Sequence, residues 1–196
     1  MGLVLLTGPA EEPVSVEEAK AHLRVSTAAD DALIGSLIAA AREHVEARCR
    51  RALVTQVWDL YLDAFPAGEE IELAMPPLRA VESVTFFRDD GTSGVMSSLE
   101  YVVDGGGGRG AVVRGRGGGW PSAELGPRNG VRVRFEAGYG GAEDVPRAIR
   151  QAVLLIVGAL YENREQVIVA QGVNLALLPF GIEALLAPYR VMRWLE

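Results

Sequence analysis

The spacing of apolar residues changes twice along the chain, and this change constrains the fold more than any other sequence feature. Over residues 15–51 apolar residues recur every three or four positions, which is typical of helices with one buried face. Over residues 55–136 short runs alternate between apolar and polar residues and are separated by Gly, Pro and Asp, as in strands. The helical spacing returns after Pro146. The sequence therefore predicts an α+β fold.

The expected helices lie at both ends of the chain. Ser15 and Glu18 form a capping-box pattern, which predicts a short helix to about Arg24, and a second helix is expected over residues 31–51. Two further helices are expected over residues 148–164 and 182–195, the last with Pro188 inside or breaking it. The residues expected to be buried against one another are Leu33, Leu37, Ala41, Val45, Ile149, Val153, Ile156, Val157 and Leu160.

The expected strands lie between these helices. Asp89-Asp90-Gly91 is a hairpin-type turn, and Pro76-Pro77 interrupts the chain between strands. The strands are expected at residues 55–63, 70–73, 81–88, 101–104, 110–114 and 131–136. We expect a helical bundle from the N- and C-terminal helices, with an inserted, mostly antiparallel β-domain. The expected parts of this single connected domain are 1–52, 53–144 and 145–196.

Composition and charge limit the possible functions. The chain carries a net charge of −7 and a pI near 5.0, whereas a protein that grips duplex DNA usually has a basic face. Cys49 is the only cysteine, so no disulfide can form within the chain. The apolar start of the chain is too short for a signal peptide, and the longest apolar stretch, residues 152–161, is too short to span a membrane. We expect a protein made in the cytosol.

No catalytic, cofactor-binding or metal-binding residue is predicted. Gly105, Gly107 and Gly110 match the letters of a dinucleotide-binding loop, but Ala111-Val112-Val113 after them indicates a strand where that site needs a helix. The two histidines lack metal-ligand spacing, and no nucleophile elbow is present. We therefore expect that the chain is not an enzyme.

Two segments are candidates for contact with partners. Residues 104–119 contain nine glycines together with Arg109, Arg114 and Arg116, which could meet passing DNA, an acidic partner or only solvent. We expect this loop to become ordered only through contacts with other chains. The apolar C-terminal end either docks on a partner or folds back on its own core. Its candidate interface residues are Leu185, Leu186, Tyr189, Arg190, Met192, Arg193 and Trp194.

The order of short motifs resembles the head–tail connector (adaptor) proteins of tailed phages and phage-like gene transfer agents. The resemblance begins with H-L-R at residues 22–24, D-D-x-L-I at 30–34 and A-R-E-x-V-E at 41–46. It continues through residues 65–66, 76–78, 120–121, 137–140, 145–146, 161–165 and 185–190. Together these motifs extend over nearly the whole chain, about residues 13–190.

The resemblance implies a structural role without catalysis or a cofactor. Such subunits form a ring, expected to be a dodecamer, in the neck of the particle. The ring binds the portal protein on one side and stopper or tail-proximal proteins on the other, while packaged double-stranded DNA crosses its channel without sequence-specific binding. The alternatives are a stopper or tail-terminator component, or a small-molecule or protein binding domain. The sequence does not distinguish a phage from a gene transfer agent.

Overall fold

The computed structural model describes residues 1–106, 108–163 and 180–191. Its contacts divide the chain into a β-rich unit, Met1–Ala10 with Val54–Tyr139, and a helical unit, Glu11–Leu53 with Gly140–Glu196. Strands and helices are therefore segregated, which confirms the α+β class and the antiparallel β insertion. The first ten residues belong to the β-rich unit, and the sequence analysis predicted no strand there.

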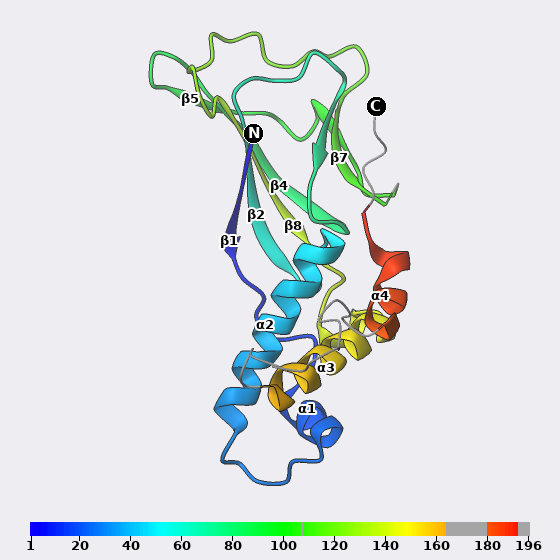
Figure 1. Ribbon diagram of the computed structural model, residues 1–196. Helices are drawn as coiled ribbons and strands as arrows, with labels where there is room; N and C mark the ends of the chain where they lie inside the picture. The colour runs from blue at the N-terminus through cyan, green and yellow to red at the C-terminus, as the bar shows by residue number, and fades with distance from the viewer. Residues whose placement is uncertain (107, 164–179, 192–196) are drawn as a thin grey trace, which may run out of the picture. The chain divides into compact units, whose positions relative to one another are not determined.

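Two antiparallel sheets make up the β-rich unit (Figure 1). The larger has the order β1-β2-β8-β4-β5, with bounds Gly2–Thr7, Gln56–Leu62, Val131–Ala137, Leu78–Phe87 and Ser93–Val95. The smaller has the order β3-β7-β6, with bounds Glu70–Leu73, Gly110–Arg114 and Tyr101–Asp104. All six expected strands are present within a few residues of their predicted bounds, whereas β1 and β5 were not expected.

One face of the larger sheet is buried because its apolar residues are aligned across neighbouring strands. Leu60 of β2 and Val84 of β4 both lie opposite Val133 of β8. Trp58 of β2 lies opposite Phe135 in the same way. Directly opposed residues point to the same face, so these side chains form one layer. Leu60, Val84, Val133 and Phe135 are each 0% exposed.

The other face of the same strands carries a part-buried ion pair between Asp59 and Arg134, which strand alternation alone does not predict. Asp59 is only 3% exposed, and its carboxylate accepts two hydrogen bonds of 2.8 Å each from the Arg134 guanidinium. These hydrogen bonds hold the pKa of Asp59 below its ordinary value, although burial alone would raise it. The pair therefore compensates a charge that would otherwise be costly to bury.

The described helices of the helical unit are α1 Val16–Leu23, α2 Asp31–Cys49, α3 Arg147–Glu162 and α4 Phe180–Leu186. Two short 3-10 helices, η1 Ala142–Asp144 and η2 Ala187–Tyr189, precede α3 and follow α4. The predicted capping box is confirmed at α1, where the Ser15 hydroxyl accepts the Glu18 N–H and the Glu18 carboxylate accepts the Ser15 N–H. The last helix ends before Pro188, as the ring of a proline in a helix interior requires.

The buried face of α2 differs from the predicted stripe at its N-terminal end. Ala41 and Val45 are fully buried as expected, but Leu33 is 37% exposed, and Ile34 and Ile38 take its place in the core. Residues four apart are separated by about 400° around a helix with 3.6 residues per turn, so a stripe with that spacing drifts by about 40° at each step. Over four steps the drift moves the first leucine to the edge of the buried face.

Helix α2 packs against α3, and α1 contacts both of them. The expected α3 residues Ile149, Val153, Ile156 and Val157 are buried, each at 5% exposure or less. Leu160, in the last turn of α3, is instead 39% exposed, so the predicted buried stripe ends one turn earlier.

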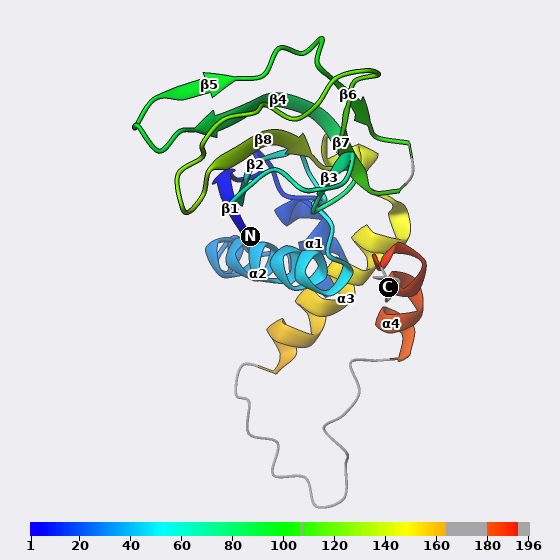
Figure 2. The ribbon, with the colours of Figure 1, turned by 90° about the horizontal axis from the view of Figure 1, so that it is seen from above.

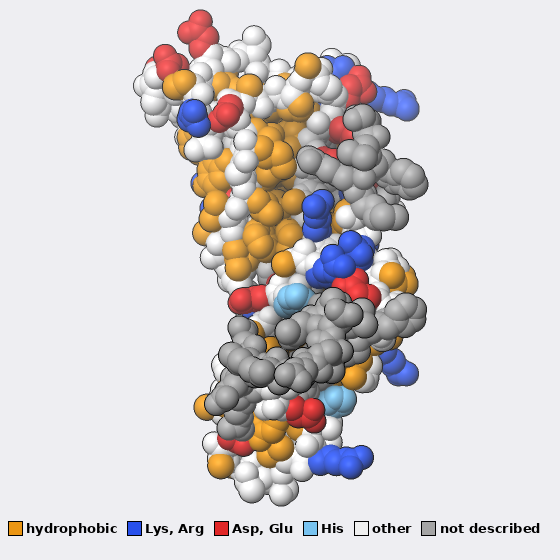
Figure 3. All heavy atoms as spheres, in the orientation of Figure 1, with side chains coloured by type: hydrophobic (Ala, Val, Ile, Leu, Met, Phe, Trp, Pro, Cys, Tyr) orange, Lys and Arg blue, Asp and Glu red, His pale blue; other side chains and the backbone are white. Residues whose placement is uncertain are grey.

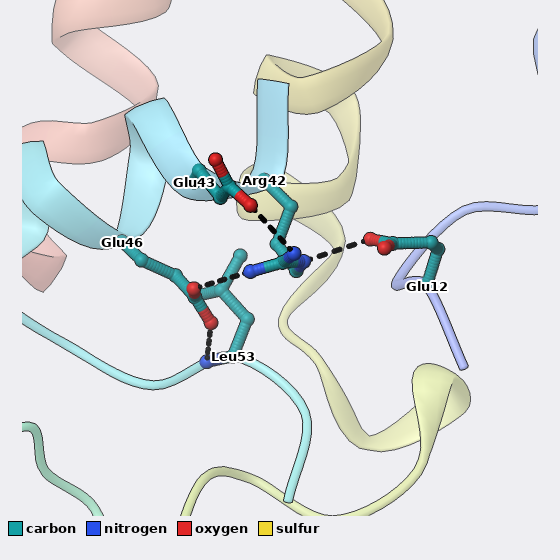
Figure 4. A network of polar contacts seen from close by, with 5 residues as sticks. All are labelled: Glu12, Arg42, Glu43, Glu46 and Leu53. Carbon is teal, nitrogen blue, oxygen red and sulfur yellow. Dashed lines mark hydrogen bonds and ion pairs between the residues drawn. The ribbon is translucent and has the colours of Figure 1, made fainter. Parts of the chain in front are cut away.

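A buried network of ions connects three segments of the helical unit (Figure 4). The Arg42 guanidinium donates to Glu12 at 2.9 Å and to Glu46 at 2.7 Å. The second oxygen of Glu46 accepts the backbone N–H of Leu53 at 2.9 Å. Arg42 and Glu46 are only 7% and 6% exposed. Burial acts to lower the pKa of Arg42, but attraction to Glu46 and Glu12 outweighs burial, so the pKa is raised and the cation is maintained.

The corrected core of α2 makes a stability prediction. Ile38→Ala should lower the free energy of unfolding by about 2–5 kcal/mol, because the side chain is 1% exposed and its loss leaves a cavity. Leu33→Ala is the matched control and should cost less than about 1 kcal/mol, because its side chain already meets solvent. Urea denaturation followed by circular dichroism measures both values. Equal losses would contradict the assignment of the buried face.

The ion network makes a second prediction. Arg42→Met should destabilise the chain by about 3–5 kcal/mol, because it leaves the Glu46 carboxylate buried without its cation. Glu43→Gln removes the outer member, which is 3.3 Å from Arg42 with a side chain 70% exposed, and should change stability by less than about 1 kcal/mol. The same denaturation assay compares them. If the arginine variant were as stable as the glutamine variant, the network would not stabilise the unit.

Candidate partner-binding surfaces

The described part of the C-terminal segment lies against its own helical unit. The Arg51 guanidinium donates to the carbonyl oxygen of Tyr189, and the Val191 N–H donates to the carbonyl oxygen of Cys49 at 3.0 Å. The end of α2 therefore holds the segment that follows α4. This arrangement favours the second alternative from the sequence for residues up to 191, in which the segment folds back on its own core.

The predicted interface residues of this segment are separated by the structure. Leu186 is 1% exposed and lies in the core, so in this conformation it offers no surface to a partner. Leu185 and Tyr189 are half-buried and Arg190 is exposed. Met192, Arg193 and Trp194 lie outside the described residues. The sequence did not distinguish Leu186 from its neighbours because the burial of one residue in a short helix depends on what packs against it.

An ion-pair cluster lies beside these residues and joins α2 to α4. The Arg48 guanidinium donates to both oxygens of Glu183, at 2.9 and 2.8 Å, and Arg190 lies 3.7 Å from the same carboxylate. The Arg48 hydrogen bonds keep the pKa of Glu183 below its ordinary value. The bidentate pair fixes the orientation of the exposed side of α4.

The glycine-arginine segment, residues 104–119, is built differently from the expected loop. Its middle is β7, and Arg109 and Arg114 lie near the two ends of that strand. Arg109 pairs with Glu72 at 2.6 Å, and Arg114 pairs with Glu69 at 2.7 Å. The acidic partners are therefore side chains of the same β-rich unit. Contacts within the chain contribute to the order of this segment, whereas the sequence led us to expect contacts with other chains only.

Arg116 differs from the other two arginines because it is exposed and follows the strand.

Gly110 opens β7, so a strand follows the glycine-rich turn, as predicted from Ala111-Val112-Val113. A Cβ atom on Gly110 would lie 2.5 Å from the Cβ of Leu78. This glycine is therefore required by the close approach of β7 to β4.

Two motifs that support the family resemblance meet in the β-rich unit. The rings of Phe65 and Trp120 are stacked, with centroids 5.2 Å apart and planes inclined by 9°. The indole N–H of Trp120 donates to the carbonyl oxygen of Gly68 at 2.8 Å. The Phe65-Pro66 and Trp120-Pro121 motifs are thus explained by packing within the unit.

The exposed apolar residues of the β-rich unit are not predicted from the sequence as a partner-binding surface. Val4, Leu5 and Leu6 of β1 are 52%, 44% and 49% exposed. Figure 3 shows hydrophobic side chains gathered over β1 and the strands beside it. The sequence carries the signal as an apolar, uncharged run over residues 2–6, but a run this short does not by itself predict a strand.

The described residues contain no group of three or more His, Cys, Asp or Glu side chains arranged to hold a metal ion. Within the same residues, no helix combines the length and apolar character needed to cross a membrane.

Comparison with known proteins gives a family match and similar solved structures. Residues 13–87 match the family model described as phage gp6-like head-tail connector protein. A chain from the neck of an empty gene transfer agent particle, computed with C6 symmetry, is 27% identical with a TM-score of 0.82, and the match covers 100% of this chain and 98% of that one. A chain from the neck of the native particle, computed with C12 symmetry, is 26% identical with a TM-score of 0.77 at the same coverage. No curated protein matches the chain.

The fold and the family match point to one class, the phage-like head–tail connector proteins: residues 13–87 match that family, and the whole chain has the fold of gene transfer agent neck chains. Within that class it is a structural connector subunit with the fold of the neck chains of gene transfer agent particles. The resemblance described from the sequence motifs is thereby confirmed.

Proposed function

We propose that this subunit forms a homo-oligomeric ring in the neck of a phage-like particle, under the portal, and joins the DNA-filled head to the tail. The observation that carries the proposal is the structural match over the whole chain to neck chains of a particle computed with C6 and C12 symmetry. The C12 neck supports a ring of twelve copies. Assembly would take place in the bacterial cytoplasm before the particle is released.

The proposed role is structural and does not involve catalysis. Its support is the connector family match together with surfaces made of ion pairs and apolar strands. A stopper or tail-terminator component is the second candidate, because such proteins occupy the same neck. The helical unit, which these mainly β-structured components would lack, favours the connector.

The portal protein is the proposed partner of the C-terminal segment. Tyr189 and Arg190 leave part of their surface open, and the segment continues into Met192, Arg193 and Trp194. Tryptophan, tyrosine and arginine are the residue types that most often dominate binding energy at interfaces. Stopper or tail-proximal proteins would bind elsewhere on the ring.

Packaged DNA is proposed to pass through the ring without being held. A chain with a net charge of −7 makes few phosphate contacts, so duplex DNA can slide past it. Glu72 and Glu69 already neutralise Arg109 and Arg114. Arg116 remains as the arginine of this segment best exposed to DNA or to a neighbouring chain.

Removal of residues 192–196 tests the portal contact. This truncation leaves the described contacts of Tyr189 and Val191 in place, so the melting temperature should stay within about 2 °C of wild type. Incorporation into particles should fall at least tenfold, measured by quantitative immunoblotting of purified particles. Arg24→Ala, an exposed change far along the chain, is the control and should be incorporated normally. Normal incorporation of the truncated chain would refute the portal contact.

A second pair of variants distinguishes the role of Arg116 from the roles of Arg109 and Arg114. Arg116→Ala should lower particle yield or packaged DNA without changing the melting temperature, because its side chain is exposed. The Arg109→Ala and Arg114→Ala double variant should also destabilise the subunit, by at most about 1 kcal/mol for each lost surface pair. Particle titre, nuclease-protected DNA and thermal melting are measured together. Wild-type titre and DNA for Arg116→Ala would remove this residue from the contact.

A further inference from the structure

Exposed apolar side chains gather in two groups within the β-rich unit. Eight of the ten large hydrophobic side chains that are exposed in the described chain lie there. The first group is on β1 and the second is on β5, β6 and the turn between them. The two groups are Met1, Val4, Leu5 and Leu6, and Val95, Leu99, Val102 and Val103.

The first group forms an unprotected sheet edge. Strand β1 pairs with β2 on one side and is the end strand of its sheet. Residues 1–8 contain no charged side chain and no proline, which are the usual means of blocking further pairing at an edge. Three successive residues, Val4 to Leu6, are exposed, so both faces of the strand present apolar surface. An edge of this kind indicates a partner.

The second group lies on different strand edges of the same unit. β5 ends the larger sheet on the side opposite to β1 (Figure 2), and β6 ends the smaller sheet. Val95, Leu99 and Val102 are 66%, 92% and 59% exposed. The acidic side chains nearby are turned to their own backbone: Glu100 accepts the Ser97 N–H, and Asp104 accepts the Gly106 N–H. The apolar residues therefore dominate this edge.

A cyclic ring of identical subunits requires two different, complementary surfaces on every subunit, because each contact is head-to-tail. A contact between two β1 edges would instead close as a dimer and leave the second group in water. We propose that the β1 edge of one subunit packs against the β5–β6 edge of the next copy around the ring. This inference rests on the proposed function, and it names the surfaces that bring neighbouring copies together.

Cross-linking in assembled particles tests the contact directly. Cys49 is the only native cysteine and is 0% exposed, so engineered thiols report on their own positions. Particles carrying Val4→Cys with Val102→Cys, treated with a short bismaleimide linker, should give a ladder of covalent oligomers on denaturing gels. Each single variant should remain monomeric. Val4→Cys with Leu33→Cys is the control pair, and a ladder of equal yield from it would overturn the proposal.

Charged variants provide a second test that does not depend on cross-linking. Val4→Lys with Leu6→Lys destroys the first edge, and Val95→Lys with Val102→Lys destroys the second. Each variant should fold, as judged by thermal melting, and be incorporated into particles at least tenfold less than Leu33→Lys. A mixture of the two retains one intact pair of edges and should form heterodimers in sedimentation analysis, whereas neither variant alone associates.

The results of these experiments distinguish a failure of the edge contact from a failure of the proposed connector role. Wild-type incorporation of both lysine variants, or no ladder from particles that contain the double-cysteine chain, would overturn the edge contact and leave the connector role intact. Absence of the wild-type chain from the necks of purified particles would overturn the connector role itself. Association of one lysine variant with itself would show a symmetric contact in place of the head-to-tail one.

Discussion

The helical unit depends on one buried cation. Arg42 lies at the centre of α2 and contacts Glu12 in the segment before α1 and Glu46 one turn further along α2. Glu46 in turn accepts the N–H of Leu53, the last residue before the chain enters the β-rich unit. A buried guanidinium is costly unless its hydrogen bonds are made, so this arrangement specifies how the segment before α1, helix α2 and the residues that follow α2 must lie. Apolar packing of α2 against α3 supplies the surrounding core.

The β-rich unit is organised by packing between its strands. Its interior is formed by aligned cross-strand pairs and by the stacked rings of Phe65 and Trp120, while its edges at β1 and at β5 and β6 expose apolar side chains. An isolated soluble domain would normally protect such edges with charge. The exposed edges are therefore better explained by assembly than by the stability of a single subunit, as expected for a connector protein.

Several arginines form ion pairs with carboxylates of their own unit. Arg48 is paired with Glu183 and Arg134 with Asp59, and in each case the carboxylate belongs to the same unit as the arginine. Such pairs fix side chains in defined positions without adding net positive charge.

The sequence by itself determined the order of helices and strands, the Ser15 cap and the α+β class, because these depend on local spacing and on hydrogen bonds between near neighbours. The motif order also carried the family resemblance. Only the tertiary structure decided that Ile34 replaces Leu33 in the core, that Leu186 is buried, and that Arg109 and Arg114 find acidic partners in their own chain. Strand β1 was missed for the same reason: a short apolar run becomes a strand when a distant strand, here β2, supplies its hydrogen bonds.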